Sequence, residues 1–172
     1  MLTEQLAELA KSRAAGRRVA QLCLGVGYSA VALSDGAGGV CYTFREELGH
    51  SCGVLPNAGG LTGMPAEDLI GWANKPGMAE RVMGYAAINA VLNQGFSPGP
   101  NISGAVDCQP EDVVGMVGFF CPLVGKFRRQ AKTLYVFEKR PGPDQLTLPE
   151  TEMGNLLPSC DMVVLTATSL VN

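Results

Sequence analysis

The chain has 172 residues, 47% of them hydrophobic and 17% charged, which is enough apolar material for one domain or two small ones and argues against a long disordered segment. A net charge of -3 leaves no basic surface to follow a phosphate backbone, so nucleic acid is not an expected partner. No run of about 18 apolar residues and no signal-peptide stretch occurs, which predicts a cytoplasmic protein without a membrane span.

The first half of the sequence predicts a three-stranded antiparallel sheet. Thr3 can cap a first amphipathic helix, which Gly16 ends. Runs rich in β-formers follow at residues 19–27, 28–33 and 40–44, and the segment SDGAGG between the last two runs suits a tight turn. In the third run alternate residues share a face, as in a half-buried strand. The pattern indicates a meander.

Two helices are expected after the meander. Pro65 suits the first position of a short helix over residues 65–73. Residues 77–95 form a longer helix that is apolar or small at almost every position after Arg81, so we expect it to be buried nearly all round. Asn89 on this helix is then a polar side chain whose burial costs free energy.

The loop over residues 45–63 holds the most reactive side chains of this half. Glu46, His50 and Cys52 lie close together in it, and imidazole and thiolate suit zinc, nickel, copper or iron. A closed tetrahedral site needs four ligands, so further donors would have to come from the other domain. The candidates are Cys121, Asp107 and Cys108. Alternatively, His50 is a loop histidine that bonds to backbone or substrate, and the six cysteines, which form no CxxC pair, are reduced and buried.

The second half predicts a parallel sheet. Residues 93–111 are rich in glycine, proline, serine and asparagine, as in an inter-domain connection, and we place the domains at residues 1–107 and 108–172. Strands and helices alternate beyond this boundary, as in α/β folds. The strands are expected at 112–120, 133–138 and 161–167, with helices at 122–131 and 149–157.

The first strand of this half runs into a tight turn. Gly118 allows a close backbone approach, and Pro122 suits the start of a helix whose N-terminal amide groups could meet phosphate or carboxylate. Glu138 ends the next strand, where nucleotide-binding folds place a ribose-binding acid. However, the segment lacks the GxGxxG spacing, and Phe119 and Phe120 would obstruct a pyrophosphate. Glycines needed only for strand-to-helix packing explain the pattern equally well.

Four blocks of the sequence resemble one protein family. They are GYAAINAVLN, VVGMVGFFCPLV, VFEKRPG and LLPSCDMVVLTATSLVN, in this order along the chain, and the resemblance as a whole extends over nearly the entire sequence. The resemblance is to the family described as putative heavy-metal chelation. It implies an α+β domain similar to the N-terminal domain of enolase, a Rossmann-like domain, and a site where the two meet. The matching positions nominate as ligand-binding residues Asn89, Gly118, Phe119, Phe120, Glu138, Thr166, Thr168 and Asn172.

The resemblance also implies a longer parallel sheet than this sequence provides. Chains of the family continue past the TSLVN block, whereas this sequence ends at Asn172, so the Rossmann-like sheet is expected to be truncated. In a 3-2-1-4 strand order, the strand that begins at Val113 then has a free edge with unpaired backbone groups. We expect a homodimer to cover this edge.

The sequence leaves three functions open and does not decide whether the protein is an enzyme. The first is a small-molecule or metal-binding protein with its site at the domain interface, for which the family implies heavy-metal chelation and a transition metal. The second is a nucleotide- or S-adenosylmethionine-dependent enzyme in which Glu138 holds a ribose. The third is a non-catalytic truncated domain that acts through oligomerisation. No GxSxG, P-loop or HExxH motif occurs, which argues against common hydrolases, NTPases and zincins.

Overall fold

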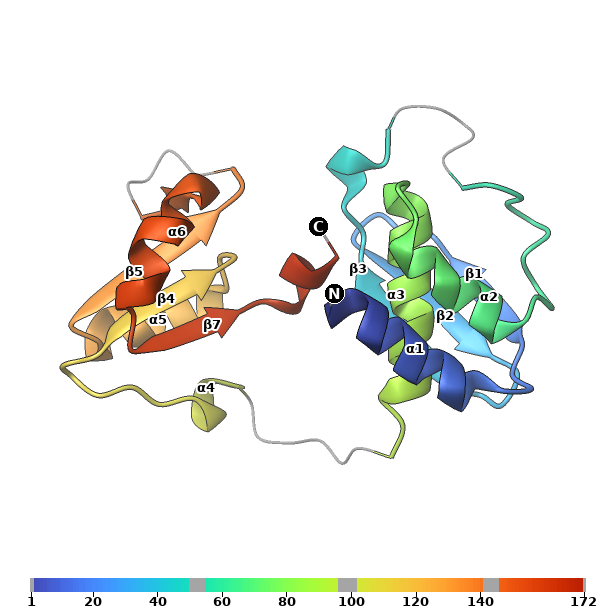
Figure 1. The fold of residues 1–172 in the computed structure, drawn as a ribbon, viewed down its shortest axis with the longest axis horizontal. Helices are drawn as coiled ribbons and strands as arrows, with labels where there is room; N and C mark the ends of the chain where they lie inside the picture. The colour runs from blue at the N-terminus through green and yellow to red at the C-terminus, as the bar shows by residue number, and fades with distance from the viewer. Residues whose placement is uncertain (1, 50–54, 96–101, 141–145, 172) are drawn as a thin grey trace. The chain divides into compact units, whose positions relative to one another are not determined.

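The computed structural model describes residues 2–49, 55–95, 102–140 and 146–171. The chain divides into two compact units, residues 1–97 and 98–170, and each is described by itself (Figure 1). The domain boundary that we placed between residues 107 and 108 remains a prediction. No helix in the described ranges is both long and apolar enough to cross a lipid bilayer.

The first unit contains the expected meander. Its sheet has the order β1-β2-β3, and both pairs of neighbouring strands are antiparallel. The elements in chain order are α1 (Leu2–Ala14), β1 (Val19–Cys23), β2 (Tyr28–Leu33), β3 (Gly38–Tyr42), η1 (Arg45–Glu47), α2 (Ala66–Gly71), η2 (Trp72–Asn74) and α3 (Met78–Leu92).

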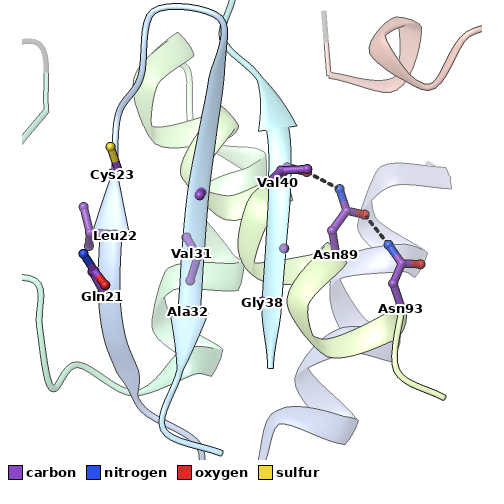
Figure 2. A pocket seen from close by; sticks show the side chains of 11 residues that line it. Gln21, Leu22, Cys23, Val31, Ala32, Gly38, Val40, Asn89 and Asn93 are labelled. Atoms are coloured by element: carbon purple, nitrogen blue, oxygen red, sulfur yellow. Dashed lines mark hydrogen bonds between the residues drawn. The ribbon is translucent and has the colours of Figure 1, made fainter. Parts of the chain in front are cut away.

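The core of the first unit lies between the sheet and α3. Val31, Leu33 and Cys41 alternate along their strands and are buried, whereas Val40 and Tyr42 on the opposite face are exposed. The predicted burial of α3 on nearly all sides is confirmed, because eleven of its residues are buried. Figure 2 shows α3 behind the strands, so the sheet has one covered and one open face.

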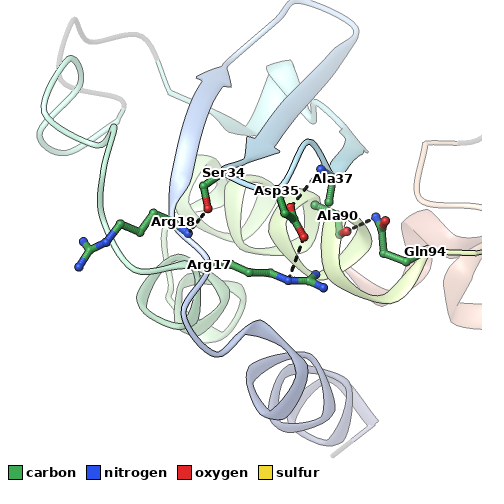
Figure 3. A network of polar contacts seen from close by, with 7 residues as sticks. All are labelled: Arg17, Arg18, Ser34, Asp35, Ala37, Ala90 and Gln94. Atoms are coloured by element: carbon green, nitrogen blue, oxygen red, sulfur yellow. Dashed lines mark hydrogen bonds and ion pairs between the residues drawn. The ribbon is translucent and has the colours of Figure 1, made fainter.

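Polar contacts tie the start of β1 to the turn between β2 and β3 (Figure 3). The Arg17 Nε lies 3.1 Å from a carboxylate oxygen of Asp35, whose other oxygen accepts a bond from the backbone N–H of Ala37. The backbone N–H of Arg18 donates to the Ser34 hydroxyl at 3.1 Å. These contacts hold the turn over the sequence SDGAGG, which the meander pattern predicts.

The second unit is the expected α/β sheet. Its strand order is β6-β5-β4-β7, and every neighbouring pair is parallel. The elements in chain order are α4 (Ile102–Ala105), β4 (Val113–Val117), α5 (Cys121–Gln130), β5 (Thr133–Glu138), β6 (Leu148–Pro149), η3 (Glu150–Glu152), α6 (Met153–Leu156), η4 (Leu157–Ser159), β7 (Met162–Leu165) and η5 (Ala167–Leu170). The core formed with α5 includes Val114, Met116 and Phe127.

The strand order corrects one expectation. β7 pairs with β4 on the side away from β5, so β4 is central and the free edge predicted for the strand beginning at Val113 does not exist. The connection from β4 to β5 and the connection from β6 to β7 run in opposite directions along the sheet. Right-handed crossovers therefore place these two connections on opposite faces. Gly115 provides room there, because a Cβ at this position would lie 2.8 Å from the Leu157 side chain and 3.0 Å from the Cys160 sulfur. A homodimer remains a prediction, but a free edge of β4 no longer supports it.

Candidate functional site

A glycine turn and two polar side chains lie at the carboxyl ends of three neighbouring strands in the second unit. Gly118 follows β4, Glu138 ends β5 and Thr166 follows β7. Because β4 lies between β5 and β7, these three ends share one edge of the sheet (Figure 1). The chain leaves β4 for β5 on one side and later returns to β7 on the other. Ligands of open α/β sheets bind at such a reversal, outside the carboxyl ends of the strands.

Gly118 forms a turn that no other residue could form equally well. Its φ of +88° lies in the left-handed region, which disfavours residues with a Cβ. A Cβ here would also lie 2.5 Å from the Thr166 Oγ1, closer than real contacts allow. The Gly118 N–H donates to the Phe137 carbonyl at 2.9 Å, and the Thr166 N–H donates to the Val117 carbonyl at 3.1 Å. Both neighbouring strands therefore fix the turn.

Glu138 closes the turn from the β5 side. The backbone N–H of Phe119 donates a hydrogen bond to the Oε1 of Glu138. Within the described ranges the carboxylate makes no further hydrogen bond or ion pair, so its second oxygen is available to a ligand. Phe119 and Phe120 are 38% and 37% exposed and place aromatic surface beside the turn. All three belong to the residues that the family resemblance nominates.

A cluster of hydroxyl groups lies on the β7 side of the turn. The Thr166 Oγ1 is 2.9 Å from the Thr168 Oγ1 and 3.2 Å from the Ser169 Oγ. Sequence reasoning nominated both threonines but missed Ser169. The signal was present, because Ser169 belongs to the same TATSLVN segment after the strand. Among the residues that the structure describes, the strand ends thus combine the Glu138 carboxylate with three hydroxyls.

Asn89 lies in the first unit and has a structural explanation of its own. Its Nδ2 donates to the Val40 carbonyl at 2.8 Å, and its Oδ1 accepts a longer bond, 3.4 Å, from the Asn93 Nδ2 (Figure 2). The first bond satisfies a carbonyl on β3, an edge strand, where unpaired backbone groups invite unwanted pairing. The two asparagines also border a pocket of about 540 Å³, which Cys23 and the outer face of the sheet line.

The predicted metal ligands are only partly within the described residues. His50 and Cys52 lie outside them, as does Asn172, and Glu46 lies in η1 beside a second pocket. The parts of the chain that the structure describes contain no group of three His, Cys, Asp or Glu side chains able to hold a metal. Burial raises the pKa of the Cys41 thiol to about 11, which keeps it protonated and unsuited to metal binding near neutral pH.

Comparisons with known proteins agree along the chain. Two family models, both described as putative heavy-metal chelation, match residues 7–92 and 101–172. A protein of unknown function from the DUF364 family of Pyrococcus horikoshii superimposes with a TM-score of 0.81 at 24% identity, over 100% of this chain and 70% of that one. A DUF364 family protein of unknown function from Desulfitobacterium hafniense superimposes with a TM-score of 0.74 at 23% identity, over 98% of this chain and 70% of that one. No curated protein matches. These matches confirm the resemblance, and the chain belongs to the family described as putative heavy-metal chelation.

Proposed function

We propose that the protein binds a small molecule through vicinal hydroxyl groups, as in the ribose of a nucleoside, at the strand ends of its second unit. The observation that carries the proposal is the position of Glu138 and Thr166 on opposite sides of the turn at Gly118. This turn lies where the strand order reverses. The proposal needs the second unit alone, and the site between two domains that the sequence suggested is not required for it.

The chemistry of these groups favours a hydroxylated ligand. A carboxylate accepts hydrogen bonds only, so the second oxygen of Glu138 can receive a hydroxyl proton. The hydroxyl group of Thr168 can donate or accept, which suits a second hydroxyl on the same ligand. The exposed rings of Phe119 and Phe120 offer apolar surface to a flat group attached to the sugar. A nucleoside combines these features.

A titration of the full chain with adenosine tests the proposal. The amide resonances of Gly118, Phe119 and Thr166 should shift in nitrogen–proton correlation spectra, and 2′,3′-dideoxyadenosine, which lacks both hydroxyls, should bind much more weakly. Glu138→Gln should weaken adenosine binding about 10- to 100-fold, since a hydrogen bond to a charged group contributes about 1.5–3 kcal/mol.

The matched control for that variant is Glu111→Gln. Glu111 is an exposed carboxylate two residues before β4, at the opposite end of the strand, so its substitution makes the same charge change away from the site. It should leave adenosine affinity unchanged. Equal binding of the dideoxy analogue, shifts confined to the first unit, or no shift at any soluble concentration would each refute the proposal.

The family's description supports a second candidate, chelation of a transition metal. The strand ends do not fit such a metal, because one carboxylate and hydroxyl groups are hard oxygen donors, whereas soft transition metals favour thiolate and imidazole. We therefore propose chelation only for Glu46, His50 and Cys52. Metal analysis of protein purified without a metal column tests this: about one metal per chain, lost in His50→Ala, supports it, and metal-free protein after incubation with zinc and nickel contradicts it.

A further inference from the structure

We infer that Glu138 makes the strand-end site selective for neutral ligands, so that a nucleoside is bound and its phosphorylated form is rejected. The inference rests on the proposed function, because it concerns the same site. It adds the ligand's charge as a criterion and assigns the discrimination to one side chain.

One of the backbone amides that a phosphate would use, that of Phe119, is already occupied. In nucleotide-binding α/β folds, a phosphate sits at the glycine turn after the first strand and accepts bonds from backbone N–H groups near the helix N-terminus. Here Phe119 supplies the first such N–H after Gly118, and it donates to Glu138. A carboxylate of the same chain therefore takes the place of the anion. A phosphate would have to displace it or approach a group of like charge.

The hydroxyl groups described at the strand ends bring no positive charge to offset that of Glu138. Thr166, Thr168 and Ser169 contribute neutral hydroxyls. Lys139 and Arg140 follow Glu138 in the sequence and already make interactions of their own. Hydroxyl groups of a ligand gain from the carboxylate because they can donate to it, whereas a phosphate dianion has no proton to donate and is repelled. The same side chain thus attracts a diol and opposes a phosphate.

The comparison of adenosine with adenosine 5′-monophosphate tests the inference in the full chain. The wild-type protein should bind adenosine at least about tenfold more tightly at low ionic strength, and the ratio should shrink as salt screens the repulsion. Glu138→Gln removes the charge and keeps a carbonyl oxygen for the Phe119 amide, so the two ligands should then differ by less than about threefold. Glu138→Asp, which keeps the charge, should retain preference for adenosine. Glu111→Gln should leave the ratio as in the wild type.

The outcomes separate this inference from the proposed function. If adenosine binds through its hydroxyls but the monophosphate binds equally well or more tightly, selectivity by Glu138 is refuted and the proposed function stands. A preference that persists unchanged in Glu138→Gln also refutes it, because another group must then cause the discrimination. If adenosine does not bind at all, the proposed function fails and the inference fails with it.

Discussion

Gly39 is the position where the packing of the first unit can be tested most sharply. It lies in β3, where the backbone of α3 packs directly against the strand. A Cβ at this position would lie 2.2 Å from the Ala86 carbonyl oxygen and 2.2 Å from the Ala90 nitrogen. Both are backbone atoms of α3, so no side-chain rotation relieves the overlap, and the helix must move away from the strand.

The substitution Gly39→Ala should destabilise the first unit by about 3 kcal/mol or more, at or above the upper end of the usual cost of overpacking a core, because backbone rather than side chain must give way. The adjacent Gly38 provides the control. A Cβ there would have only the Val31 carbonyl oxygen within 4 Å, at 3.9 Å, so Gly38→Ala should change stability by less than about 1 kcal/mol and can stabilise by restricting the unfolded chain.

Urea unfolding followed by tryptophan fluorescence measures both variants. The protein has one tryptophan, Trp72, which lies in η2 against α3, so its emission reports on the first unit. The expected result is a large decrease in the midpoint for Gly39→Ala at an unchanged slope, and almost none for Gly38→Ala. A loss below about 1 kcal/mol for Gly39→Ala would show that α3 does not pack on β3 as closely as the structure has it.

Three further predictions concern single groups. Gly118→Ala should speed hydrogen exchange of the β4 amides, because the left-handed backbone costs about 1–2 kcal/mol and the Thr166 overlap adds to it; unchanged exchange would contradict the turn geometry. Thr43→Val should cost about 1–3 kcal/mol by leaving the buried Ser29 hydroxyl, 2.6 Å away, without a partner, and adding Ser29→Ala should recover part of this in urea unfolding. The pKa of Cys41, raised by burial to about 11, should make stability fall as pH rises from about 9 to 11, and Cys41→Ser should flatten that decline.

The strand-end residues could be predicted from the sequence, whereas their neighbours could not. Period-2 and strand-helix alternation locate β4, β5 and β7, and the carboxyl ends of parallel strands necessarily share one edge. The order of the strands depends on which face each crossover takes, and no local pattern encodes that choice. The predicted strand order was wrong for β7, because the sequence does not show what packs against Gly115. In the structure Leu157 and Cys160 pack over this glycine, and the chain returns beside β4.

Asn89 shows a different limit of sequence reasoning. The sequence pattern places it on a helix that is buried nearly all round, but the structure leaves it half-buried beside the first pocket, where it bonds to the Val40 carbonyl, 49 residues away in the chain. A sequence records the need for a hydrogen bond and not its identity. The same limit applies to Glu138. Its position at the end of a strand predicts a role in ligand binding, but the sequence does not show that its carboxylate accepts a hydrogen bond from the Phe119 amide.

The bond between Glu138 and Phe119 leads to one more prediction, because closing a turn requires an acceptor and not a charge. A glutamine offers a carbonyl oxygen of the same reach, so Glu138→Gln should keep the turn and change the stability of the second unit by less than about 1 kcal/mol. Its affinity for adenosine should nevertheless fall about tenfold or more. Hydrogen exchange at the Gly118 amide measures the first quantity and a ligand titration the second. Exchange that accelerates in proportion to the lost affinity would reduce Glu138 to a structural residue.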